Sequence, residues 1–157
     1  MKKPFGSLLA ILLSVSATAL AQSADGRLTG TWDAVVTIRN CVRGGGGSAI
    51  RSFQSVGSFN QGGTFSGITS GTPPTLRTSE RGVWAHVAGD TYRFRFKAYL
   101  YSADALVIGY QIVTHDLQLD ADDQHYTSDG VTQIFSPDGT QIGVGCSTSD
   151  GTRMVLD

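Results

Sequence analysis

Residues 91–101, TYRFRFKAYLY, alternate strictly between two kinds of side chain. Phe94 and Phe96 fall on one face of an extended chain, while Arg93 and Arg95 fall on the other. Because successive side chains of a β-strand point to opposite faces, this period of two predicts a strand with one face in a core and the other in water. The chain must therefore supply further strands that complete that core.

Eight segments separated by turn residues are predicted as strands. The intervening stretches are rich in glycine, proline, asparagine and aspartate, which favour turns and interrupt ladder pairing. After the first 21 residues we find no segment with helical periodicity. Eight short strands at regular spacing predict an all-β fold, either an antiparallel sandwich or an up-and-down barrel. The predicted strands are residues 31–41, 50–60, 64–70, 81–88, 91–101, 106–119, 125–135 and 140–147.

Two of the predicted strands alternate less cleanly. Segment 125–135 has polar residues on both faces until its last few positions, and segment 110–119 changes the parity of its apolar residues near Thr114. The parity change predicts either a bulge there or a strand that passes from one environment to another. Polar residues on both faces fit a barrel with a partly polar interior better than a tightly packed sandwich. We therefore predict a single antiparallel eight-stranded up-and-down barrel within residues 22–157.

The first 21 residues have the features of a secretory signal peptide. Lys2 and Lys3 precede a short apolar run, and the triplet ALA at 19–21 places small residues where signal peptidase cleaves. The apolar run is too short for a convincing membrane-spanning helix. The sequence therefore predicts cleavage before Gln22 and export to the periplasm or the extracellular space.

The charge of the mature chain argues against one class of partner. Without Lys2 and Lys3 the chain has ten basic and thirteen acidic side chains, a net charge of −3 with histidine neutral. Its basic residues are scattered, whereas a nucleic-acid-binding protein presents a basic patch or stripe. We therefore predict no nucleic-acid partner. The sequence does not indicate an oligomeric state.

Cys41 and Cys146 are the only cysteines. In an exported chain an isolated pair predicts one disulfide, and no neighbouring residue supports a catalytic thiol or a metal site. Simple alternation places Cys41 on the face of its strand opposite Trp32, and Cys146 on the face of Ile142 and Val144. A bulge or the glycine-rich connector would have to reconcile these positions if the bond forms.

Gly30-Thr31-Trp32 stands at the head of the first predicted strand, and Arg153 lies near the C-terminus. With the strand count, this pattern resembles a lipocalin-type (calycin) barrel. In that superfamily a G-x-W tryptophan plugs the closed end of the barrel, and an arginine from the last part of the chain packs across its indole. The resemblance implies these structural roles for Trp32 and Arg153. Burial of an indole and a guanidinium over its face both stabilise a fold.

The layout of the chain is also similar to a group of exported bacterial proteins for which no activity is established. That resemblance implies a fold and an exported location. The residues that carry it are Gly30 to Trp32, Cys41, Phe59, Gly62 to Thr64, Gly82 to Trp84, Gly145-Cys146 and Gly151 to Arg153.

Motifs for catalysis and metal binding do not stand out. His86, His115 and His125 lie on three different predicted strands, so they have no local metal-ligand spacing. The acidic run at 120–123 lacks the glycine and glutamate of a calcium loop and is typical of a hairpin turn. Glu80 is the only glutamate, and no G-x-S-x-G motif occurs. The sequence predicts no catalytic residue, no metal and no cofactor.

Aromatic side chains are the candidates for a ligand site. In an eight-stranded barrel they either line a small apolar cavity or fill the interior completely, and the sequence leaves both arrangements open. Our leading hypothesis is that the barrel binds a small apolar or amphipathic molecule without catalysis. The predicted lining residues are Phe53, Phe59, Trp84, Phe94, Phe96 and Tyr110.

Two alternatives remain open at this point. A cavity-based isomerase or cyclase resembling allene oxide cyclase would use Tyr110, His86 or Glu80 first, and would show a buried polar cluster with perturbed protonation. A small outer-membrane barrel would need Arg93 and Arg95 to face a lumen. Few other strands have a lipid-facing apolar stripe, so the sequence does not favour membrane association.

Overall fold

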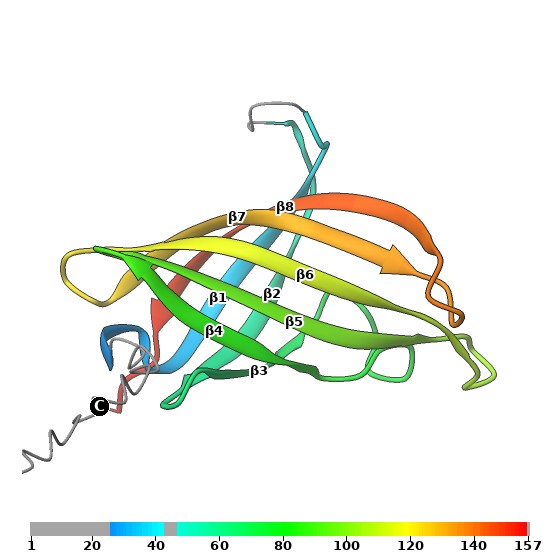
Figure 1. The fold of residues 1–157 in the computed structure, drawn as a ribbon, viewed down its shortest axis with the longest axis horizontal. Helices are drawn as coiled ribbons and strands as arrows, with labels where there is room; N and C mark the ends of the chain where they lie inside the picture. The colour runs from blue at the N-terminus through cyan, green and yellow to red at the C-terminus, as the bar shows by residue number, and fades with distance from the viewer. Residues whose placement is uncertain (1–25, 43–46, 157) are drawn as a thin grey trace, which may run out of the picture.

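The computed structural model describes residues 26–42 and 47–156. The predicted signal peptide, residues 1–21, lies outside them. A short 3-10 helix, η1 (Gly26–Leu28), precedes eight strands in up-and-down order that close into one antiparallel barrel (Figure 1). This confirms the predicted all-β class and barrel topology. The strands are β1 (Gly30–Arg39), β2 (Ala49–Asn60), β3 (Thr64–Thr69), β4 (Glu80–Ala88), β5 (Thr91–Tyr101), β6 (Val107–Leu119), β7 (His125–Phe135) and β8 (Gln141–Arg153).

Strand β8 is longer than the sequence predicts. It continues past Ser147 to Arg153, and its backbone pairs with β1 on one side and β7 on the other. Small polar residues occupy both faces of this extension, with Ser149 buried and Asp150 exposed, so the alternation that marks a strand is hidden there. Backbone pairing with both neighbouring strands keeps this segment extended although its sequence does not alternate.

Of the two explanations for the parity change near Thr114, the structure supports a strand that passes from one environment to another, and the bulge is absent. Strand β6 pairs with β5 in continuous register from Gln118 to Gly109. Its apolar residues change parity because, near the open end of the barrel, Tyr110 and Ile112 face outward on the same side as the exposed Ile108. The apolar signal therefore moves from the inner to the outer face along one regular strand.

One end of the barrel is closed by Trp32, which is fully buried. Its indole Nε1 donates to the carbonyl of Leu28 at 3.0 Å, which fixes η1 across this end. The guanidinium carbon of Arg153 lies 4.3 Å from the centre of the Trp32 ring, as the lipocalin resemblance implies. Arg153 also donates to the backbone carbonyls of Thr29 and Asp123, each at 2.7 Å. In Figure 1 the helix (blue) lies beside the end of β8 (red).

Cys41 and Cys146 form the predicted disulfide, with their Cα atoms 5.2 Å apart. No bulge in the β1–β8 ladder is needed, because its register runs without a shift from Trp32 to Arg39. The apolar neighbours Ile142 and Val144 face outward and are 63% and 57% exposed. The bond therefore links two positions on the outer surface, and the conflict in parity does not arise.

No helix among the described residues is long and apolar enough to cross a membrane.

Candidate functional site: a cavity with two kinds of wall

A cavity of about 270 Å³ lies between the closed end and the opposite, open end of the barrel, and all eight strands contribute to its lining. It exists because several inward positions carry small residues, among them Gly57, Gly145, Ser147 and Ser149. At Gly145 the nearest atom to the place of a side-chain Cβ is in Thr132, 3.8 Å away. The space in front of Gly145 is therefore open.

Three of the predicted lining residues, Phe53, Phe94 and Phe96, border the cavity. Phe59 and Trp84 do not: they lie deeper, in an aromatic base against the closed end. The ring of Phe59 is 5.9 Å from that of Trp84 and 5.4 Å from that of Phe94, edge to face in both pairs. The interior is therefore filled at one end and hollow in the remainder.

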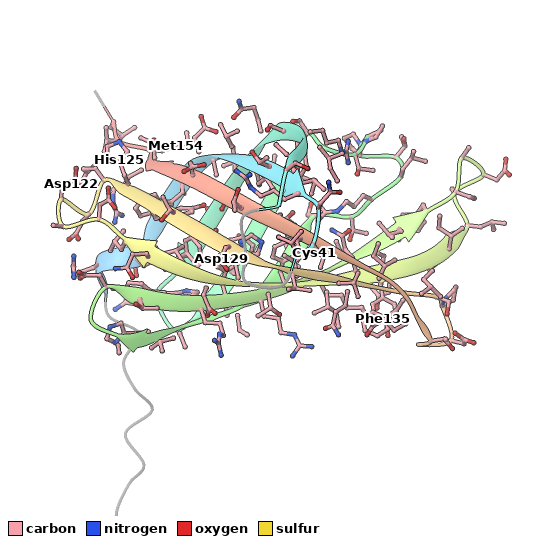
Figure 2. All side chains as sticks on the ribbon, turned by 90° about the horizontal axis from the view of Figure 1, so that it is seen from above. Cys41, Asp122, His125, Asp129, Phe135 and Met154 are labelled. Atoms are coloured by element: carbon pink, nitrogen blue, oxygen red, sulfur yellow. A yellow bond between two sulfur atoms is a disulfide. The ribbon has the colours of Figure 1, made fainter. Side chains whose placement is uncertain are left out.

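Tyr110 lies on the outer face of the barrel. Its ring stacks on Phe135 at 5.0 Å between centroids, and the ammonium of Lys97 lies 3.8 Å from its centre. Gly109 and Gln111 take the inward positions beside it, which turns Tyr110 outward. Figure 2 shows Phe135 near the open end, away from Asp122 and His125 on the β6–β7 turn.

An aromatic wall of Phe65, Phe94 and Phe96 forms one side of the cavity. Phe94 and Phe96 are nearly parallel, with an interplanar angle of 18°, and Phe65 lies 26° from Phe96. Glycine makes room for these rings: a Cβ on Gly57 would lie 2.9 Å from the ring of Phe65. The wall therefore consists of aromatic rings rather than flexible aliphatic chains.

A chain of hydrogen-bonded side chains, which we call the polar chain, comes from β6, β7 and β8. The imidazole of His115 contacts Ser128 through Nδ1 and Ser147 through Nε2, each at 2.9 Å. Ser128 contacts Ser149 at 2.6 Å, and Ser149 hydrogen-bonds Tyr126. All five side chains are buried, and all except Ser128 border the cavity.

The polar chain is uncharged near neutral pH. Burial lowers the pKa of His115 to about 4, with a smaller opposing effect from Asp116. Burial also raises the pKa of Tyr126 to about 12, partly offset by its hydrogen bond with Ser149. The imidazole therefore stays neutral and the phenol stays protonated.

Toward the open end, Arg77 and Glu80 form a buried ion pair, with Nη2 and Oε1 2.9 Å apart. Gln111, with its side-chain oxygen turned toward Arg77, accepts from Nη2 at 2.6 Å and from Nε at 3.0 Å. Burial raises the pKa of Glu80, and Arg77 opposes this change. Arg77 lies in the loop between β3 and β4 and forms an isolated β-bridge with Leu100 near the end of β5. This backbone pairing directs its side chain inward. The pair places opposite charges side by side, so the buried part of the cavity has no excess charge, while Arg51 lies in the exposed part of the lining.

The three residues named for an isomerase are not brought together. Glu80 borders the cavity, and Tyr110 faces outward. His86 contacts the carbonyl of Gly89 at 2.6 Å in the β4–β5 turn, at the closed end. Sequence analysis does not indicate the polar chain, because the partners of His115 lie on other strands and are not adjacent to it in the sequence. Its only signal is parity: His115 shares the inward face of β6 with Leu117.

Among the described residues, Asp120, Asp122 and His125 are the one group whose ligand atoms lie within 4.8 Å of one another. All three are exposed. Asp122 accepts from the backbone NH of Gln124 at 2.8 Å, which is a hydrogen bond typical of a turn. This arrangement fits the hairpin turn that the sequence predicts.

The chain matches no protein-family model and no curated protein.

Proposed function

We propose that the protein is an exported, lipocalin-like barrel that binds a small amphipathic molecule in its interior without catalysis. The observation that supports it most is the cavity itself, in which an aromatic wall faces buried hydrogen-bonding groups. Ligand sites commonly combine apolar walls with a few well-placed polar groups. The disulfide favours an oxidising compartment, and therefore export.

The size of the cavity limits the ligand. A volume of 270 Å³ equals that of about nine water molecules, and it is just below the usual range for drug-sized ligands. A long-chain lipid would have to extend beyond the mouth. A compact molecule is the better fit.

Catalysis as an isomerase is less well supported. General acid–base catalysis works best with groups whose pKa lies near the working pH. His115, with a pKa of about 4, is a weak base, and Tyr126, with a pKa of about 12, is a weak acid. These groups are suited to hydrogen bonding rather than to proton transfer.

An outer-membrane barrel is not favoured either. Arg93 and Asp116 form an ion pair on the outer face of β5 and β6, with side chains 59% and 51% exposed. A transmembrane barrel presents an apolar outer band and a polar interior, whereas here Trp32 and Phe59 fill the inside.

A filled-cavity variant tests the proposal. We would screen a diverse set of small molecules against the wild-type protein and Gly145→Phe, using the thermal unfolding midpoint as the readout. Gly145→Phe places a ring in the cavity, whereas Val144→Phe on the outer face is the matched control. We expect stabilisation of wild type and Val144→Phe but not of folded Gly145→Phe. Equal stabilisation of all three proteins would contradict binding in the cavity.

A further inference from the structure

The two walls of the cavity meet at one point. The ring of Phe94 lies 5.3 Å from the imidazole of His115, and the two residues are paired across β5 and β6. A molecule whose polar edge reaches His115 or Ser147 therefore has its body beside the rings of Phe94 and Phe96. The arrangement suits a ligand with a flat apolar body and a polar group on its edge.

The polar chain can present either a donor or an acceptor. A neutral imidazole has one N–H and one lone pair, so it donates to one of Ser147 and Ser128 and accepts from the other. When Nε2 donates to Ser147, the Ser147 hydroxyl is free to donate to a ligand carbonyl. When the other tautomer forms, Ser147 donates to Nε2 and offers a lone pair to a ligand hydroxyl.

Charge in the buried part of the cavity is already balanced, and the remaining charged residue of the lining, Arg51, is exposed. The guanidinium of Arg77 is paired with Glu80 and Gln111, and the polar chain is neutral. A buried ion without a partner is strongly disfavoured. A charged ligand group in this buried part would have to break the Arg77–Glu80 pair before it gained a partner of its own.

We propose that the ligand is an uncharged, planar aromatic molecule that carries a hydroxyl or carbonyl group on its edge, with that group at Ser147 and His115 and its ring against Phe94 and Phe96. This inference rests on the proposed function, because it names the chemical class that the same cavity takes.

Four related probes separate the parts of this inference: β-naphthol, naphthalene, β-naphthoate and decahydro-β-naphthol. Calorimetric titration at neutral pH gives the affinity of each for the wild-type protein. We expect β-naphthol to bind about tenfold more tightly than naphthalene or β-naphthoate, since it alone combines the flat ring with an uncharged hydrogen-bonding group. The puckered decahydro-β-naphthol should bind several-fold more weakly than β-naphthol.

The Ser147→Ala variant locates the polar contact. It should weaken β-naphthol binding about tenfold and leave naphthalene binding unchanged. Ser66→Ala, on the outward face of β3, is the matched control and should change neither. Ser147→Gly, which removes the same hydroxyl, takes the place of Ser147→Ala if the latter does not fold.

Three results would overturn the inference. One is β-naphthoate binding as tightly as β-naphthol, which would make Arg77 or Arg51 an anion site. Another is β-naphthol affinity that neither serine variant changes. The third is that β-naphthol does not bind, whereas other screened molecules bind to wild type but not to Gly145→Phe. In that case the proposed function stands and only the ligand class is wrong. Failure of every screened molecule to bind in that manner would instead overturn the proposed function.

Discussion

The two halves of the barrel use the same eight strands and the same inward parity, yet one half is solid and the other is hollow. Toward the closed end, inward positions carry large side chains such as Trp32, Phe59 and Tyr92, which are almost completely buried. In the hollow half they carry small residues such as Gly145 and Ser147. Residue size at inward positions, rather than a motif, therefore decides whether a small barrel can hold a ligand.

The halves also differ in what stabilises them. The closed end depends on aromatic packing and on Arg153 over Trp32. The hollow half buries polar groups, which are tolerated only because His115, Arg77 and Glu80 all have partners. Substitutions in the two halves should consequently differ in their effects on stability and on ligand binding.

The largest effect is expected at the closed end. Trp32→Ala removes a fully buried indole and should lower the free energy of unfolding by about 3–5 kcal/mol. Urea denaturation measures this loss. Ligand affinity, measured at a temperature where the variant is folded, should be unchanged. A variant of normal stability that had lost ligand binding would reverse the roles assigned to the two halves.

Breaking the ion pair of the hollow half should lower the free energy of unfolding by a smaller amount, and removing both of its charges should restore most of that loss. Arg77→Met leaves the Glu80 carboxyl buried without its cation and should cost about 3 kcal/mol. The double variant Arg77→Met with Glu80→Leu removes both charges and should regain most of that stability. Urea denaturation of the two variants checks the difference. If the double variant were less stable than the single one, the pair would not be the reason for the loss.

The pH dependence of stability should report on His115. Its pKa in the folded protein is about 4, below the ordinary value of 6.5, so between these two pH values the unfolded chain binds more protons. The contribution of neutral His115 to the free energy of unfolding is fully present above pH 6.5. About 2–3 kcal/mol of it is lost as the pH falls to 4. His115→Gln keeps polar contacts but does not titrate, so its stability should fall less over this range. Glu80 has a raised pKa, so its contribution to the free energy of unfolding changes with pH in the opposite direction. Because both proteins contain Glu80, this contribution is common to the two pH profiles.

The sequence predicts the barrel well and the cavity in part. Alternation locates the strands, and β5 and β7 have the predicted bounds. The parity rule also places Phe94 and Phe96 inward, on the face that borders the cavity. Tyr110 instead lies on the face of β6 opposite Leu117, because an aromatic side chain can pack in an outer cluster such as that with Phe135 as well as in a core.

The polar side of the site could not be predicted, for two physical reasons. The serines of β7 and β8 are small and polar on the inward face, so they erase the alternation that reveals a strand's orientation. The direction of Arg77 depends on a long-range contact, its bridge to Leu100, which local sequence does not encode. Both become evident only when the registers of neighbouring strands are known.

A crystal structure of the protein soaked with a brominated β-naphthol would show where the ligand binds, because the anomalous signal of bromine locates the probe. We expect the ring to lie between the aromatic wall and the polar chain, with the probe hydroxyl within hydrogen-bonding distance of Ser147 or His115. A probe bound only to the outer cluster of Tyr99, Tyr110 and Phe135, with the interior unchanged, would contradict this expectation.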